Sequence, residues 1–471
     1  MVNFTVIDLA LLVIFVIFVS AFLYRNKKNL KRDGLLYLYR TSWGMKLIDK
    51  TGKKYYKTLG FLSYVSVAIG YLLMAGILYM FGKIVYLYVA YPAVVKAIKI
   101  PPITPLLPYI DKLVPNLGLP SFYFIYFIVI LAIVAIFHEF AHGIFMRRHG
   151  IKVKSTGFGF FPFFFPIFLA AFVEQDEKSM ESKKPFPQMA VLSAGTFANI
   201  ITAIIGFGIL VLFFALSFAP AGVQFNTYAY TATNVSMISS INGVDLTNTT
   251  YDKLVELSVD EEYNNITISG RDFVATKEFI ESQNETAENY LVLYDDAPAI
   301  RNNISGAITQ IDDERISSWN DLSNAISMYS PGNEVTITTT DGVYEIVLTA
   351  RPDNSSAAWM GIGIVDKILP TINGERMMIP YVGRNAVDYE PKFEFAVFIL
   401  NFLEWLVLIA FSVALVNMLP MGIFDGGRFF YLTIFAITKS KRKAEKWFKG
   451  VTRFLLFLVI LLMVFWVIGI L

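Results

Sequence analysis

The chain has 471 residues, of which 55 % are hydrophobic and only 17 % are charged, and it contains no cysteine. Its mean hydropathy is +0.54. Soluble proteins carry about 25 % charged residues, so this composition excludes a purely soluble enzyme, a disordered chain and a disulfide-stabilised secreted domain. The sequence therefore predicts a polytopic α-helical membrane protein.

Six apolar runs are long enough to span a bilayer, which takes about 20 residues in a helix. They are residues 4–23, 60–81, 121–147, 189–218, 395–416 and 451–471. Two further apolar runs, residues 156–173 and 428–437, are interrupted by glycine and proline or are too short to span. We expect both to be re-entrant, a form of backbone that persists at membrane depth only where protein or a water-filled cavity covers it.

Charged residues set the expected orientation of these spans. Basic residues cluster directly after the first span and again at residues 147–154 and 439–449, which the positive-inside rule assigns to the cytoplasm. The amino terminus and residues 220–390 then lie outside, and this long segment carries 25 acidic and 9 basic residues. We expect a multi-pass protein of the cell membrane, with the lipid bilayer as a partner. Basic residues beside spans determine topology, so no nucleic-acid partner is expected.

The external segment contains two similar stretches. Residues 238–254 and 308–322 each read as a short strand, a polar turn, an apolar anchor and a helix start, and alternating strands follow both. The later copy, from about residue 295 to 350, resembles a PDZ domain, and the earlier copy is a degraded match. The expected fold is thus about six transmembrane helices plus re-entrant segments, with an inserted extracytoplasmic α+β domain that is PDZ-like and either tandem or single.

The third span ends in the residues His138-Glu139-Phe140-Ala141-His142. Residues four apart lie on one face of a helix, so both imidazoles can bind one metal ion. Glu139, about 100° round the helix, then faces a metal-bound water, which is the arrangement of a zinc hydrolase. Ionisable groups inside a membrane span are costly, so they are functional by default.

Two histidines leave zinc one protein ligand short of the usual catalytic three. His149 lies in a basic loop, where we expect a surface residue. Four carboxylates in a charged, loop-like stretch have suitable chemistry: Glu174, Asp176, Glu177 and Glu181. Asp425 is the better candidate, because it is a lone carboxylate in an apolar surround where Pro420 and two glycines must interrupt the helix. An unwound helix can turn that carboxylate inward, and the structural alternative is a helix cap.

Three motifs resemble those of the site-2 protease family of intramembrane zinc metalloproteases, nearest to its archaeal and eukaryotic branches. HEFAHGI is similar to the family's HExxHG helix, NMLPMGIFDGG to its N-x-x-P-x-x-x-x-D-G segment, and SAGTFANI to its G-P-x-x-N helix. Thr196 stands where the family usually has proline. The resemblance covers most of the chain, from residues near the amino terminus to the last helix.

The resemblance implies specific roles for six residues. These are His138, His142 and Asp425 as ligands of one Zn²⁺ per chain, Glu139 as the catalytic carboxylate, and Asn199 and Asn417 as polar groups near the scissile peptide. The expected activity is hydrolysis of peptide bonds within or next to transmembrane segments of membrane-anchored substrates, as in regulated intramembrane proteolysis. The position of the motif in its span places the zinc in the cytoplasmic half of the bilayer.

Five parts are expected along the chain. They are two N-terminal transmembrane helices with a basic cytoplasmic loop and a Pro-rich external loop (residues 1–120), the first part of the catalytic membrane core (121–219), the external domain (220–390), the second part of the core (391–438), and a basic loop with the last helix (439–471). The stretch at residues 157–166 offers either a strand edge that holds an unwound substrate or a buried apolar hairpin.

Two other functions remain open from the sequence. One is a protease that cuts at the membrane surface and takes a glutamate as its third zinc ligand. The other is a transporter or receptor with an acidic external sensor, which would use Asp8 and Glu404 within its spans. For a protease, the expected partners are a transmembrane protein substrate and a peptide or chain end, which PDZ-like pockets bind by adding a strand.

Overall fold

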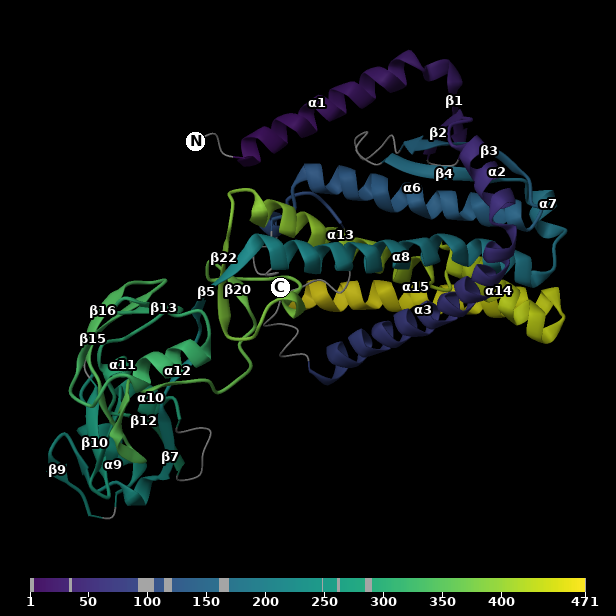
Figure 1. Cartoon of the computed structure of the whole chain (residues 1–471). Coiled ribbons are helices and arrows are strands. Elements are labelled where there is room, and N and C mark those ends of the chain that lie inside the picture. Colours follow the sequence, from purple (N-terminus) through teal and green to yellow (C-terminus); the bar gives the residue numbers. More distant parts are fainter. Residues whose placement is uncertain are drawn as a thin grey trace. The chain divides into compact units, whose positions relative to one another are not determined.

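The computed structural model describes residues 4–33, 36–91, 106–113, 121–160, 169–247, 249–260, 263–283 and 290–470 (Figure 1). The chain divides into two compact units. The first, here called the membrane unit, comprises Met1–Leu212 and Phe398–Leu471, and the second, the insert, comprises Phe213–Val397.

Six helices in the described part of the chain are long and apolar enough to cross a membrane. They are α1 (Phe4–Arg25), α3 (Tyr56–Ala90), α6 (Phe124–Arg148), α8 (Pro185–Ser217), α13 (Ala396–Asn417) and α15 (Lys441–Ile470). Four shorter helices complete the membrane unit: α2 (Met45–Lys54), α5 (Ile110–Leu113), α7 (Glu177–Glu181) and α14 (Asp425–Thr438). The number of spans predicted from the sequence is confirmed, and their orientation stays a prediction.

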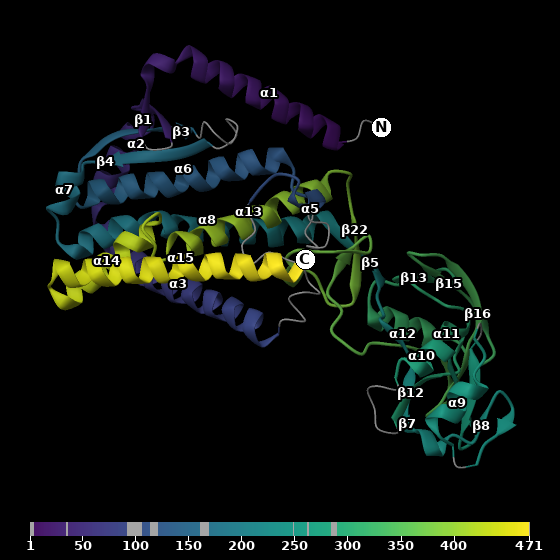
Figure 2. The ribbon, with the colours of Figure 1, turned by 180° about the vertical axis from the view of Figure 1, so that it is seen from behind.

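A four-stranded antiparallel sheet packs beside α6, and Figure 2 shows its strand β4 running alongside that helix. The strands are β1 (Leu30–Asp33), β2 (Leu36–Thr41), β3 (Val153–Phe160) and β4 (Leu169–Gln175), in that spatial order. The run predicted to be re-entrant therefore begins in β3 and ends in β4, while residues 161–168 lie outside the described residues. Because β3 pairs with a strand on each side, the edge next to α6 belongs to β4 and not to residues 157–160.

The amino-terminal end of α6 is capped by a residue from another helix. Asp8 of α1 is fully buried. Its Oδ2 accepts hydrogen bonds from the backbone N–H of Phe124 and from the hydroxyl group of Tyr109, each at 2.6 Å. Its Oδ1 accepts from the backbone N–H of Ile125 at 3.0 Å. The first N–H groups of a helix have no partners within the helix, so a carboxylate can accept their hydrogen bonds. Its negative charge is also attracted to the positive end of the helix dipole. Asp8 thus fixes the helix that carries the histidines.

The cytoplasm-directed end of α6, by the predicted orientation, is held by α2. Ile48 of α2 is fully buried against the surface of α6 at Gly143, and Asp49 forms an ion pair with Arg147. The guanidinium of Arg148 lies 3.7 Å from the centre of the Tyr56 ring. Both ends of the histidine-bearing helix are therefore tied to neighbouring elements.

The insert contains two modules with separate hydrophobic cores. The first module has a sheet of β7 (Tyr230–Asn234), β12 (Tyr290–Asp295), β11 (Arg271–Ala275), β10 (Asn264–Ile268), β8 (Ser240–Ile241) and β9 (Val244–Asp245), with α9 (Tyr251–Leu257) and α10 (Lys277–Glu281). The second has β16 (Val343–Val347), β15 (Glu334–Thr339), β13 (Ile308–Ile311), β14 (Glu314–Arg315), β5 (Phe218–Val223), β22 (Val387–Pro391), β20 (Thr371–Ile372) and β21 (Glu375–Arg376), with α11 (Pro298–Arg301) and α12 (Trp319–Ser327). Two strand pairs complete the insert: β17 (Thr349–Arg351) with β18 (Asn354–Trp359), and β19 (Ile362–Gly363) with β6 (Thr227–Tyr228).

Each of the two similar sequence stretches contributes to one of these cores. Ile241 and Leu254 of the earlier stretch lie in the first core, and Ile311 and Leu322 of the later stretch lie in the second. The repeat seen in the sequence thus corresponds to two separately packed modules. Their likeness to PDZ domains stays a prediction.

Candidate metal centre

Three ligand atoms from two helices converge at one point of the membrane unit. The Nε2 atoms of His138 and His142 are 3.0 Å apart, and Oδ2 of Asp425 lies 3.3 Å from each of them. Tetrahedral zinc with bonds of 2.0–2.1 Å has its ligand atoms about 3.3 Å apart. The triangle therefore has the size of one face of a zinc coordination tetrahedron, so these residues fit the ion that the sequence motif indicates.

The turn between α13 and α14 brings Asp425 to the histidines. The helix α13 ends at Asn417, and the backbone then turns through hydrogen bonds from Met421 N to the Leu419 carbonyl (2.7 Å) and from Phe424 N to the Met421 carbonyl (3.1 Å). Asp425 begins α14, where a negative charge faces the positive end of the helix dipole. The helix interruption expected around Pro420 places the carboxylate where a third ligand belongs.

The far sides of both imidazoles have polar partners. His142 donates from Nδ1 to the backbone carbonyl of Val191 at 2.7 Å, which leaves Nε2 as the unprotonated, metal-facing nitrogen. Nδ1 of His138 lies 3.0 Å from the amide of Asn199, a fully buried residue of α8. In the described part of the chain Asn199 Oδ1 has no hydrogen-bond partner. A flipped amide turns that oxygen toward a protonated Nδ1, so that Asn199 accepts from His138 and leaves Nε2 of His138 as the metal-facing nitrogen.

Gly195 of α8 closes the centre on the side opposite the α6 backbone. A Cβ atom at this position would lie 2.4 Å from His142 Nε2 and 2.5 Å from His138 Nε2. Any larger residue would collide with both imidazoles. Sequence reasoning did not single out Gly195, although its place in SAGTFANI, one turn before Asn199, was a signal for close helix approach.

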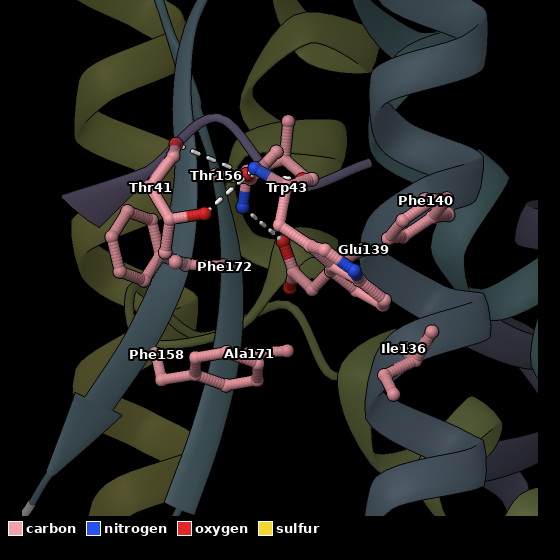
Figure 3. Close-up of a pocket in the computed structure, with 11 residues that line it drawn as sticks. Thr41, Trp43, Ile136, Glu139, Phe140, Thr156, Phe158, Ala171 and Phe172 are labelled. Carbon is pink, nitrogen blue, oxygen red and sulfur yellow. Dashed lines mark hydrogen bonds between the residues drawn. The ribbon is translucent and has the colours of Figure 1, made fainter. Parts of the chain in front are cut away.

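Glu139 reaches the same space from the flank of α6. One carboxylate oxygen, Oε2, accepts a hydrogen bond from the backbone N–H of Val173 in β4 at 2.9 Å (Figure 3). The ligand-type atoms of His138, Glu139 and His142 lie within 4.8 Å of one another. The carboxylate is thus held beside the metal position without being one of the three ligands of the triangle.

Sequence comparison matches residues 126–462 with peptidase family M50, a span that includes all the residues of this centre. The chain belongs to peptidase family M50. This is the site-2 protease family of metallopeptidases. The uncharacterized protein MJ0971 of Methanocaldococcus jannaschii is 31 % identical over 194 residues, which cover 41 % of this chain and 47 % of that protein. The chain therefore matches about half the length of this curated relative.

The other candidate ligands of this M50 chain have different partners. Glu174 Oε2 accepts hydrogen bonds from Ser155 Oγ (2.6 Å) and Arg40 Nε (2.8 Å), and both interactions lower the pKa of its carboxyl group. Asp176 caps α7 by accepting from the backbone N–H of Ser179. Glu174 is thus fixed in the sheet as the partner of a cation, and the geometry favours Asp425 as the third ligand.

His149 and Asn417 were also singled out in the sequence. His149, expected at the surface, is half-buried because Ser63 of α3 approaches its Nε2 to 3.0 Å. Burial, together with the charges of Arg148 and Lys183, lowers the pKa of His149 to about 4. Asn417 is the last residue of α13 and is half-buried, and its role near the scissile peptide stays a prediction.

A polar cavity of about 450 Å³ reaches this M50 centre. His142, Glu139 and Asp425 line it together with the charged side chains of Lys154 and Glu177. A site built for hydrolysis needs water at its carboxylate, and this cavity is large and polar enough to hold many water molecules.

Proposed function

We propose that the protein is an intramembrane zinc metallopeptidase that hydrolyses peptide bonds within or next to transmembrane segments of membrane-anchored proteins. The observation that carries the proposal is the triangle formed by His138, His142 and Asp425 beside the carboxylate of Glu139. Membership of peptidase family M50 supports the same conclusion. The position of the histidines in a span that ends at Arg148 supports a site in the cytoplasmic half of a multi-pass membrane protein.

His138, His142 and Asp425 would hold the zinc ion. When bound, zinc acidifies water and polarises a peptide carbonyl. Glu139 accepts the proton of the attacking water and then delivers it to the departing amine. Its hydrogen bond from the N–H of Val173 fixes the direction of the carboxylate before substrate arrives. Little further conformational entropy is then lost when the reaction begins.

A transmembrane helix hides its peptide bonds in its own hydrogen bonds, so a substrate has to unwind before cleavage. Strand β4 is the edge strand beside α6, and Val173 within it already directs a backbone N–H at Glu139. We assign to this edge the role of pairing with the unwound substrate, since strand addition holds a peptide extended through backbone hydrogen bonds. The peptide carbonyl then lies close to Glu139.

The test uses purified protein in lipid nanodiscs with a reporter that carries one transmembrane segment. Wild type should cleave it, a chelator should stop cleavage, and added zinc should restore it. Glu139→Gln should keep zinc and lower the rate at least about 100-fold, because the amide cannot accept a proton. Glu445→Gln, a change of the same type at an exposed position of α15, is the control. Near-normal cleavage by Glu139→Gln contradicts the proposal.

We also propose that the insert limits which proteins reach the site. A groove of about 550 Å³ runs between α12 and β18 and is lined by Trp319, Leu322, Ile326 and Met360. A groove between a helix and a strand is the form that accepts a chain end by strand addition. The insert as a whole is acidic and has its own folded cores, and these properties favour a selecting role over a catalytic one.

Excision of residues 226–389 with a flexible linker in their place tests this second proposal. The shortened protein should keep its zinc, since the ligands lie in the membrane unit, and it should cleave substrates with bulky external domains that wild type excludes. Loss of zinc, or unchanged discrimination between long and short external domains, contradicts a selecting role.

A further inference from the structure

Three neighbouring cavities near Glu139 share lining residues in succession. An apolar groove of about 1000 Å³ is lined by residues 42–47 and by the face of α6 that carries Phe137 and Ile144. A slot of about 10 Å³ follows, and it shares Trp43, Ile136 and Phe140 with the groove. The slot in turn shares Glu139 and Val173 with the polar cavity of the metal centre. The groove, the slot and the polar cavity therefore lie in series, separated by the side chains that they share.

Two aromatic side chains stand where the groove passes into the slot. The rings of Trp43 and Phe140 meet edge to face with their centres 5.6 Å apart. Gly44 brings the two together: its φ of +80° suits glycine, and a Cβ there would lie 2.3 Å from the tip of the Phe140 ring. Figure 3 shows Trp43, Phe140 and Ile136 around the Glu139 carboxylate.

The backbone that carries Trp43 is fixed, whereas its side chain is not enclosed. Thr156 of β3 is buried and donates from Oγ1 to the Trp43 carbonyl at 2.6 Å, and Trp43 N donates to Thr41 Oγ1 at 2.7 Å. Trp43 as a whole residue is 58 % exposed. A rotamer change can therefore move the indole without disturbing the loop, and such changes are fast for exposed side chains.

The slot is too small for a peptide in this structure. A volume of about 10 Å³ holds about one water molecule, so no amino-acid residue passes while the two rings touch. We propose that Trp43 and Phe140 form an aromatic gate through which the unwound segment of a transmembrane substrate passes from the apolar groove to Glu139. The gate admits small side chains at the scissile position more readily than large ones. The inference rests on the proposed function and adds the residues that set its specificity.

The occupant of the groove follows from its chemistry and its continuation. Its lining is mostly apolar, as a membrane-spanning segment requires, with Ser42, Lys46 and Thr51 as the polar members. The slot that follows is lined by Glu139, and the polar cavity lies beyond it. A lipid acyl chain could also fill the groove, but it has no peptide bond to bring to Glu139. Dependence of cleavage specificity on Trp43 therefore distinguishes a peptide from a lipid.

A labelling experiment tests the gate without catalysis. The chain has no native cysteine, so Ala171→Cys places a single thiol in the slot. A lipophilic maleimide should label it at least about tenfold faster when Trp43→Ala is added, because close packing otherwise excludes the reagent. A charged maleimide, which arrives through the polar cavity, should react at an unchanged rate. Tyr55→Ala, at an exposed aromatic outside the lining of groove and slot, is the matched control. Equal lipophilic labelling in all three proteins overturns the gate.

Cleavage specificity provides the second readout. Reporters with glycine, alanine, leucine or phenylalanine at the scissile position should show a wild-type preference for the small residues. Trp43→Ala should reduce that preference about tenfold or more, within the range that a hydrophobic pocket can discriminate, and Trp43→Phe should restore it. An unchanged preference in active Trp43→Ala refutes the gate. If no variant cleaves any reporter, the proposed function fails, while the labelling rates still decide whether the gate exists. Trp43→Leu replaces Trp43→Ala if that variant does not fold.

Discussion

A single methyl group at Gly195 should empty the metal centre. The added Cβ would lie 2.4 Å from His142 Nε2 and 2.5 Å from His138 Nε2, whereas real Cβ contacts are essentially never shorter than 3.0 Å. Both imidazoles have to move, or α8 has to withdraw. A zinc site tolerates changes of only about 0.2 Å in its ligand distances, and either movement exceeds this. The metal then loses at least one of its ligands.

The loss should appear directly in zinc content. A disturbed ligand shell typically lowers metal affinity by about 10–100-fold, and a change that displaces two ligands together should reach at least the upper part of this range. Gly195→Ala is purified next to wild type, and zinc is measured by elemental analysis and by competition with a chelator of known affinity. Gly208→Ala is the matched control on the same helix, because a Cβ there meets nothing within 4 Å.

Helicity and thermal unfolding of the zinc-free proteins separate a local effect from misfolding. Both alanine variants should remain folded, since alanine favours a helix over glycine. If Gly195→Ala binds zinc as tightly as Gly208→Ala, the imidazoles do not meet α8 as described, and the metal position derived from them is wrong.

Three further predictions follow from the described contacts. Asp425→Ala should lower zinc affinity more than about tenfold, whereas Glu174→Ala should leave it unchanged, and the opposite order would support the surface protease with a glutamate ligand. Asp8→Ala should destabilise the protein by at least about 2 kcal/mol in detergent unfolding, more than Asp111→Ala, because three donors lose a charged acceptor where the control loses one. The pKa of His149 is lowered to about 4, so wild type should lose stability as the pH falls from 6.5 toward 4, and His149→Gln should flatten that part of the curve.

The grouping of the candidate ligands could be predicted from the sequence because its signals are local. His138, Glu139 and His142 are fixed relative to one another by helix geometry alone, so their spacing determines their joint position. Asp425 required one further inference, that a helix broken at Pro420 turns its carboxylate inward. The separation between α13 and α14 and the ligand distances agree with that inference.

The residues that complete the site could not be predicted, because their roles depend on contacts between distant segments. Asp8 caps a helix that begins more than a hundred residues later, and Trp43 meets Phe140 only because the sheet carries its loop to α6. The sequence indicated strand structure at residues 157–166, but it gave no sign that β3 pairs with β2, which lies more than a hundred residues earlier in the chain. The sequence also predicted His149 at the surface, because its neighbours in the chain are basic. Its contact with Ser63 of α3, a residue distant in the sequence, could not be foreseen.

In the reaction proposed above, hydrolysis of a membrane-embedded peptide requires two reactants that do not mix, water and an apolar segment. The polar cavity lined by Glu139 and Asp425 would provide the water, and the apolar groove lined by Trp43 would provide the peptide. A slot of about 10 Å³ lies between them and has room for about one water molecule, so it limits the passage of water into the groove while no substrate is present. The gate that limits side-chain size therefore also preserves the dry lining on which the binding of an apolar segment depends. A variant that opens the slot should gain substrate range and lose affinity for transmembrane segments together, since both consequences have one cause.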